Sequence, residues 1–130
     1  MIRFLAIFIA VFSIQEPVLD EKEMYGTWSW VQSSGGLLGN TLTPDNIRLS
    51  KKIVLTKDHV IMYYANDSLT LKQNYQIQNE KSIYSHSPAP VLRISGMTKT
   101  QTISLRGQDT LFLRENVYDG YAHVYVRVRE

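Results

Sequence analysis

The chain of 130 residues contains no cysteine. This absence excludes a disulfide framework, a thiolate zinc site, a cysteine nucleophile and a lipid anchor attached to cysteine. Many small exported domains depend on disulfides for their stability. A single domain of this length must instead be stabilised by one hydrophobic core.

An excess of charge of either sign is also missing. The 14 lysines and arginines nearly balance the 12 aspartates and glutamates, and the formal net charge is +2. Apart from the pair Lys51-Lys52, the basic residues are scattered along the chain. A nucleic-acid-binding protein needs a concentrated basic surface, so the sequence argues against a nucleic-acid partner.

Recognisable catalytic and metal-binding patterns are absent from the sequence as well. The histidines at positions 59, 86 and 123 do not have the spacing of metal ligands. There is no Gly-x-Ser-x-Gly nucleophile motif, and most aspartates stand at predicted turns. We therefore expect a protein that is not an enzyme and that uses no metal and no cofactor.

Only one hydrophobic run is long and unbroken, from Phe4 to Phe12, and Arg3 precedes it. The run is shorter than the roughly 20 residues that span a bilayer. Val11 and Ser13 place acceptable residues at the usual minus-three and minus-one cleavage positions. The pattern predicts a signal peptide over residues 1–14 and a linker over residues 15–24. The mature protein is expected to be secreted or periplasmic, without membrane insertion.

From residue 25 onward, short β-rich runs alternate with turn residues, and no helical period is sustained. Leu69, Leu71, Tyr75 and Ile77 share one face of the clearest run, and polar side chains share the other, as in a strand with one buried face. The expected strands cover residues 25–32, 51–56, 59–65, 69–78, 82–87, 91–95, 100–106, 110–115 and 121–129. Eight or nine strands joined mostly by hairpins predict an all-β fold. Residues 25–130 should form a single antiparallel up-and-down β-barrel of about eight strands.

The breaks between the strands lead to two further expectations. Asn79-Glu80 is interpreted as a turn, and Pro88 and Pro90 are interpreted as the end of the next strand because proline has no N–H to donate. Residues 33–46 contain three glycines and Pro44. We interpret them as a long loop that forms a mobile lid or rim at the open mouth.

Three features together resemble the lipocalin-like domain superfamily, in particular its small exported bacterial members. They are Gly26-Thr27-Trp28 on the first strand, the long loop that follows, and the last strand Tyr121–Arg127 with a late arginine. The resemblance implies a closed barrel end whose floor is made by Gly26, Trp28 and Arg127. It also implies that the arginine packs across the tryptophan.

The candidate ligand-binding residues follow from the expected interior of such a barrel: Trp30, Leu71, Gln73, Tyr75, Tyr125 and Arg127. Arg127 has two possible roles, because it could neutralise a ligand carboxylate or serve only as a lid on Trp28. The sequence does not choose between the two faces of the last strand. One face carries residues 121, 123, 125 and 127, and the other carries residues 122, 124, 126 and 128.

Two functional hypotheses remain. The first is a binding protein that holds a small hydrophobic or amphipathic molecule inside the barrel. The second is a packed interaction or structural module of the cell envelope, which meets a protein partner or a second copy of itself through outer apolar surface. A hollow interior favours the first hypothesis and a filled interior favours the second.

The first prediction concerns processing. Export should remove the first 13 to 15 residues, because Arg3 and the run Phe4–Phe12 have the arrangement that signal peptidase recognises. Mass spectrometry of the protein recovered from its native compartment measures this directly. A mature species that still carries Met1 would contradict the prediction.

Overall fold

The computed structural model describes residues 19–129, so the predicted signal peptide lies outside the described residues. Within residues 19–129 no helix is long and apolar enough to cross a membrane. A short 3₁₀ helix, η1 (Glu21–Met24), precedes the first strand, and one short α-helix, α1 (Pro44–Ile47), follows the second. The strands are β1 (Gly26–Gly35), β2 (Asn40–Leu42), β3 (Lys51–Leu55), β4 (Val60–Ala65), β5 (Ser68–Ser82), β6 (Ser85–Ile94), β7 (Gln101–Arg106), β8 (Thr110–Glu115) and β9 (Tyr121–Arg127).

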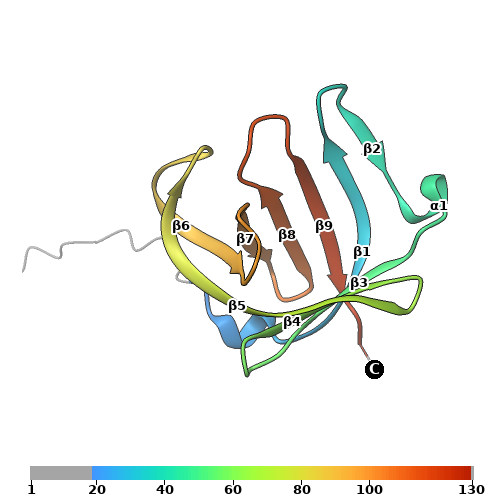
Figure 1. Ribbon diagram of the computed structural model, residues 1–130, viewed down its shortest axis with the longest axis horizontal. Coiled ribbons are helices and arrows are strands. Elements are labelled where there is room, and N and C mark those ends of the chain that lie inside the picture. Colours follow the sequence, from blue (N-terminus) through green and yellow to red (C-terminus); the bar gives the residue numbers. More distant parts are fainter. Residues whose placement is uncertain (1–18, 130) are drawn as a thin grey trace, which may run out of the picture.

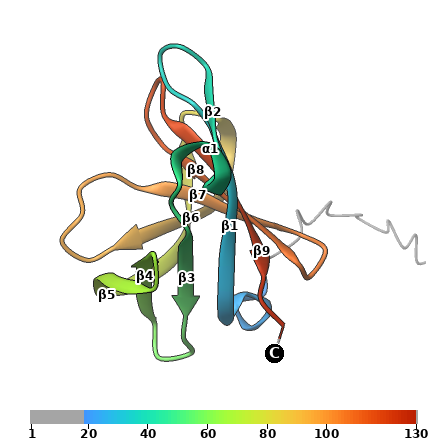
Figure 2. The same ribbon diagram turned by 90° about the vertical axis from the view of Figure 1, so that its right-hand side faces the viewer.

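The predicted all-β fold and the up-and-down barrel are confirmed. Consecutive strands from β3 to β9 pair antiparallel, and β1 pairs with both β3 and β9, so eight strands close into a barrel (Figures 1 and 2). The ninth strand, β2, pairs only with β1 and lies outside the closed ring. Closure leaves no free edge at the junction of the first and last strands.

Trp28 and Arg127 meet where the barrel closes. They are paired in the register of β1 and β9, and the Arg127 guanidinium lies 4.2 Å from the centroid of the fully buried Trp28 ring. The indole N–H donates to the Met24 carbonyl at 2.8 Å. Gly26 has φ +130°, and a Cβ there would lie 3.1 Å from Arg127 Nη1. The predicted contact across the barrel floor is therefore present, and it accounts for glycine two residues before the tryptophan.

Packing at the floor extends into residues that the sequence assigns to a linker. Met24, the last residue of η1, is fully buried and belongs to the core. Around it and Trp28, inward-facing side chains from most of the strands form one continuous cluster. Its buried members include Ile53, Leu55, Ile61, Tyr75, Leu92, Ile94, Ile103, Leu111 and Leu113.

Residues 33–46 are more ordered than the long loop that the sequence predicts. β1 continues to Gly35 and forms a hairpin with β2, and α1 then turns the chain toward β3. Thr43 Oγ1 caps α1 by accepting from the Asn46 backbone N–H at 3.2 Å, and Asn46 Oδ1 accepts from the Thr43 backbone N–H at 2.8 Å. This capping box fixes a helical turn that has no hydrophobic periodicity.

The predicted turn at Asn79-Glu80 is wrong, because β5 runs through both residues to Ser82. The regular alternation in β5 also has an interruption near its start. Tyr63 pairs with Leu71 and Tyr64 pairs with Leu69, which leaves one extra residue, Thr70, on β5. The bulge reverses the face of the residues before it, and Leu69 is 51% exposed rather than buried with Leu71.

The expectation that Pro88 and Pro90 end a strand is also wrong, because both lie inside β6. The Ser95 N–H donates to the Asn74 carbonyl at 2.9 Å, and these residues stand opposite each other in the register of β5 and β6. Since bonding alternates along an antiparallel pair, odd-numbered residues of β6 bond to β5 and even-numbered residues face β7. Pro90 therefore lacks an N–H only on the side away from β5, and its pairing with Asn79 keeps the register. Pro88 lies in the irregular stretch where the β5–β6 register shifts between Glu80 and Ser82.

The same orientation explains why β6 and β7 pair so briefly. Their ladder contains only Val91↔Thr102 and Leu92↔Gln101. The next hydrogen-bonded pair would place Pro90 opposite Ile103, and Pro90 has no N–H for the Ile103 carbonyl. The ladder stops there, and a groove of about 440 Å³ lies against β7 and β8, bordered by the turn between β5 and β6.

The second prediction concerns the floor of the barrel. Trp28→Ala should lower the free energy of unfolding by about 3–5 kcal/mol, because it removes a fully buried indole. Arg127→Ala should cost about 1–3 kcal/mol, because it leaves backbone carbonyls without their donors. Urea denaturation measures both, with Val128→Ala as a control on an exposed side chain near the same strand end. Equal, small losses in all three variants would contradict this account of the closure.

Candidate functional site

The barrel interior is not filled along its whole length. A cavity of about 360 Å³ lies at the level of β1 residues Trp30 and Ser33, beyond the packed floor around Trp28. Its wall combines apolar side chains with a few polar ones. The lining residues are Lys51, Tyr63, Tyr64, Ala65, Thr70, Leu71, Met97, Gln101, His123 and Tyr125.

The structure decides which face of the last strand points inward. Tyr125 is 4% exposed and packs in the core, and His123 is largely buried, whereas Val126 is 39% exposed. The face with Tyr121, His123, Tyr125 and Arg127 is therefore the inner one. The interior carries more polar groups than a plain aliphatic core would, and these groups need partners.

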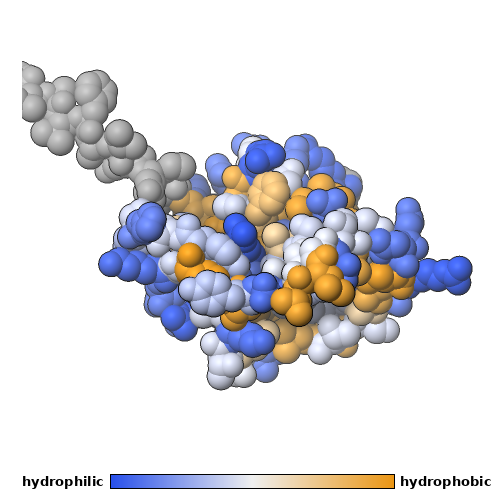
Figure 3. All heavy atoms as spheres, turned by 90° about the horizontal axis from the view of Figure 1, so that it is seen from above, coloured by the Kyte–Doolittle hydropathy of each residue, from blue (hydrophilic) through white to orange (hydrophobic). Residues whose placement is uncertain are grey.

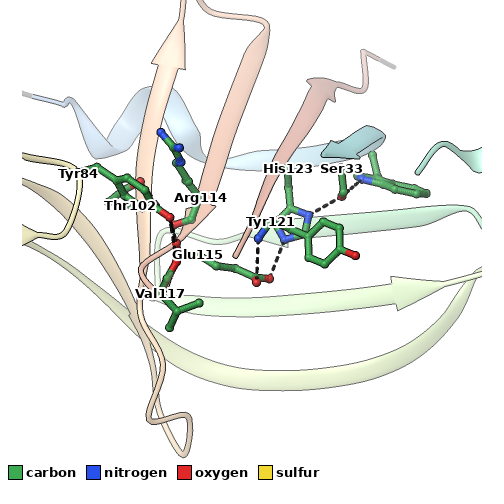
Figure 4. Close-up of polar contacts among 9 residues, drawn as sticks. Ser33, Tyr84, Thr102, Arg114, Glu115, Val117, Tyr121 and His123 are labelled. Carbon is green, nitrogen blue, oxygen red and sulfur yellow. Dashed lines mark hydrogen bonds and ion pairs between the residues drawn. The ribbon is translucent and has the colours of Figure 1, made fainter. Parts of the chain in front are cut away.

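A continuous chain of polar contacts runs along one wall of the interior. The Trp30 indole N–H donates to Ser33 Oγ at 2.7 Å, and Ser33 Oγ contacts His123 Nδ1 at 2.5 Å. On the other side of the ring, His123 Nε2 lies 3.1 Å from Glu115 Oε2. The second carboxylate oxygen of Glu115 accepts the Tyr121 backbone N–H at 3.1 Å (Figure 4). We call these residues, Trp30, Ser33, His123 and Glu115, the polar relay.

The donors of the relay are satisfied when His123 is neutral. Ser33 Oγ accepts from Trp30, so its single proton is available for His123 Nδ1, and the imidazole proton then lies on Nε2 facing Glu115. Burial lowers the pKa of His123, and the positive charge of Lys51 lowers it further, against the opposing effect of Glu115. Protonation at Nδ1 would also leave the Ser33 hydroxyl without this acceptor.

The relay is tied to the hairpin that precedes the last strand. A Cβ on Gly35 would lie 2.4 Å from the Gly120 carbonyl oxygen, and one on Gly36 would lie 2.9 Å from the Tyr121 hydroxyl. Both glycines have positive φ, so this close approach of the two hairpins requires glycine. The β1–β2 hairpin thus packs directly on the turn that Glu115 holds.

A second set of contacts holds the turn between β5 and β6 near the end of β8. The Tyr84 hydroxyl lies 2.8 Å from the Glu115 carbonyl and 3.0 Å from the Val117 carbonyl. The Arg114 guanidinium lies 3.8 Å from the centroid of the Tyr84 ring (Figure 4). These contacts form one border of the groove of about 440 Å³ that lies against β7 and β8, which we call the outer groove.

The predicted ligand-binding residues separate into three places. Leu71 and Tyr125 line the cavity. Trp30 and Tyr75 are buried and do not line it, and Tyr75 donates its hydroxyl to the Thr56 carbonyl at 3.0 Å. Burial raises the pKa of Tyr75 to about 12, so this phenol stays protonated at neutral pH. Gln73 is exposed, on the part of β5 beyond the last β5–β6 pair, Tyr75↔Ile94.

Arg127 lies at the floor and not at the cavity. Its guanidinium donates to the carbonyls of Gln108 and Tyr25, both at 2.9 Å, and to the carbonyl of Glu23. It does not line the cavity. Of the two roles that the sequence leaves open for Arg127, the structure places it in the structural one.

Several cavity residues were not among the candidates from the sequence, notably Lys51, Tyr63, Gln101 and His123. One signal was available, since His123 shares a strand face with Tyr125. Tyr63 and Gln101 come from different strands and meet only after the barrel closes. Burial raises the pKa of Tyr63, and the Gln101 side chain opposes that rise. No residue from 33–46 lines the cavity, so the expected lid contributes no side chain to its wall.

Ser33, His123 and Glu115 resemble a catalytic triad in residue type only. Ser33 is 2% exposed, accepts from the Trp30 indole and does not line the cavity. A nucleophile must reach the substrate, so this hydroxyl cannot attack a molecule held there. Within residues 19–129 no group of three or more histidine, aspartate and glutamate side chains could hold a metal ion.

Comparison with protein-family models, curated protein sequences and solved structures finds no match for this chain. The closed eight-stranded antiparallel barrel is compatible with a lipocalin-like fold. The functional argument therefore rests on the cavity and the relay themselves.

The third prediction concerns pH. Since the pKa of His123 is lower in the folded state than its value of about 6.5 in an unfolded chain, the unfolded state binds the proton more readily. The contribution of neutral His123 to the stability of the folded state is full above about pH 6.5, and it decreases as the pH falls toward the folded pKa. Between about pH 7.5 and about pH 5.5, wild type should lose more unfolding free energy in urea than His123→Gln. His86→Gln is the control, because His86 is exposed, and its profile should follow wild type. Identical profiles for wild type and His123→Gln would show that His123 does not act this way.

Proposed function

We propose that this protein is an exported lipocalin-like binding protein that holds a small amphipathic molecule in its barrel cavity. One observation carries the proposal, namely the cavity of about 360 Å³ in the upper half of a barrel whose lower half is solid. Small-molecule sites occupy roughly 300–1,000 Å³, so this volume suits a small ligand.

Packing density supports this interpretation. Protein interiors are close-packed and contain few voids larger than a water molecule. The core below the cavity obeys this rule, with Trp28, Ile53, Ile61 and Leu111 fully buried. The hollow directly above it is partly open to solvent, so its apolar wall meets water that a bound molecule would displace.

The composition of the wall supports an amphipathic guest. Leu71, Met97 and the aromatic rings offer apolar contacts, while Gln101 and the hydroxyl of Tyr125 offer hydrogen bonds. Within residues 19–129 no buried polar side-chain atom lacks a partner. The Tyr125 hydroxyl has no hydrogen-bond partner among the described residues, so it opens to the cavity. A mostly apolar wall with a few polar groups is typical of small-molecule sites.

The alternative, an interaction module, has one observation in its favour. Leu37 and Leu38 at the tip of the β1–β2 hairpin are each 83% exposed, and Tyr118 between β8 and β9 is 85% exposed. Figure 3 looks onto the end where these two hairpin loops rise, and hydrophobic and hydrophilic residues are interspersed there. Exposed side chains of this size favour contact with a partner, but they leave the cavity unexplained.

The fourth prediction tests the cavity. The dye 1-anilinonaphthalene-8-sulfonate should bind wild type with enhanced fluorescence, because its rings fit an apolar pocket. Ala65→Leu adds volume to the cavity wall and should weaken binding at least tenfold. Ala89→Leu adds the same volume in the outer groove and should bind like wild type.

Circular dichroism and thermal unfolding should first establish that both variants are folded. Absence of dye uptake by folded wild type, or equal uptake by Ala65→Leu and wild type, would contradict ligand binding in the cavity and favour the interaction module.

A further inference from the structure

Two adjacent lysines at the start of β3 face opposite ways. Lys52 lies 3.5 Å from the carboxylate of Asp67 in an exposed ion pair. Lys51 lines the cavity, and its ammonium lies 4.6 Å from the centroid of the buried Trp30 ring. The alternation of a strand separates the two charges, so only one of them belongs to the site.

The positive charge of Lys51 is not matched by a carboxylate. Within residues 19–129 no aspartate or glutamate forms an ion pair with Lys51. Its ammonium instead makes a cation–π contact with the face of Trp30. The Glu115 carboxylate contacts His123 and the Tyr121 backbone N–H and forms no ion pair with Lys51. Lys51 is only partly buried, so water and the Trp30 face both contact its ammonium, and no carboxylate among the described residues competes with an anionic guest for it.

The groups around Lys51 add hydrogen bonds and no negative charge. His123 is neutral in the polar relay and is within electrostatic reach of Lys51, whose charge contributes to its low pKa. Burial raises the pKa values of Tyr63 and Tyr125, so both phenols are protonated at neutral pH. The Gln101 amide also lines the cavity and carries no charge.

We propose that the cavity selects an amphipathic anion, a carboxylate or sulfonate attached to an apolar chain or ring, and that Lys51 pairs with its head group. This inference rests on the proposed function and names its ligand class. The apolar part lies along Leu71 and Met97, and the head group lies near Gln101 and the Tyr125 hydroxyl. An anion there supplies the counter-charge that the chain itself does not provide.

Decanoate and 1-decanol test the inference, because they share one chain and differ in head-group charge. Binding of each is measured by calorimetry at about pH 7.5, where a carboxyl group is ionised. Wild type should bind decanoate at least tenfold more tightly than decanol, and added salt should reduce the difference. Lys51→Gln should lose at least tenfold in affinity for decanoate and keep its affinity for decanol.

Lys52→Gln is the matched control, because it removes the same charge from the neighbouring residue outside the cavity. It should bind both compounds like wild type. If wild type binds the two compounds equally, or if Lys51→Gln and Lys52→Gln bind decanoate alike, the anion site is wrong while ligand binding in the cavity stands. If folded wild type binds neither compound nor the dye, the proposed function and this inference both fail.

Discussion

The structure depends on one junction, the pairing of the first and last strands. There the Arg127 guanidinium covers the buried Trp28 ring and donates to three backbone carbonyls, two of them from the segment that leads into β1. The interaction joins residues at opposite ends of the described chain and closes eight strands into a barrel. Because a closed barrel has an inside along its whole length, this junction also creates the space in which the candidate site lies.

That inside has two unlike halves. Near the floor, aliphatic side chains and Trp28 fill it as in an ordinary core. Beyond Trp30, the inward face of β9 carries His123, which could not be packed against aliphatic side chains without a partner. The polar relay supplies partners in sequence and keeps this wall rigid without filling the space in front of it. A hollow therefore persists in a barrel that has no disulfide to support it.

Charge is distributed in accordance with this division. Arg127 is held by backbone carbonyls at the floor, and Lys52 is paired with Asp67 outside. Lys51 alone places a cation at the cavity wall without a carboxylate among the described residues, and the aromatic face below it stabilises it only in part. The proposed anionic ligand would complete this arrangement. Because His123 is neutral, it does not repel the Lys51 ammonium.

The sequence alone determined the features that depend on local periodicity and local chemistry. The two-residue alternation identified most of the strands and the all-β class. The resemblance carried by Gly26-Thr27-Trp28 and Arg127 indicated the floor. The sequence failed where the meaning of a residue depends on its neighbours across strands. Pro90 is compatible with β6 because its missing N–H faces away from β5, and Thr70 changes the face of Leu69 because β4 has no residue opposite it. The cavity belongs to this second class: Lys51, Gln101 and His123 are distant in sequence, and only the closure of the barrel brings them around one cavity.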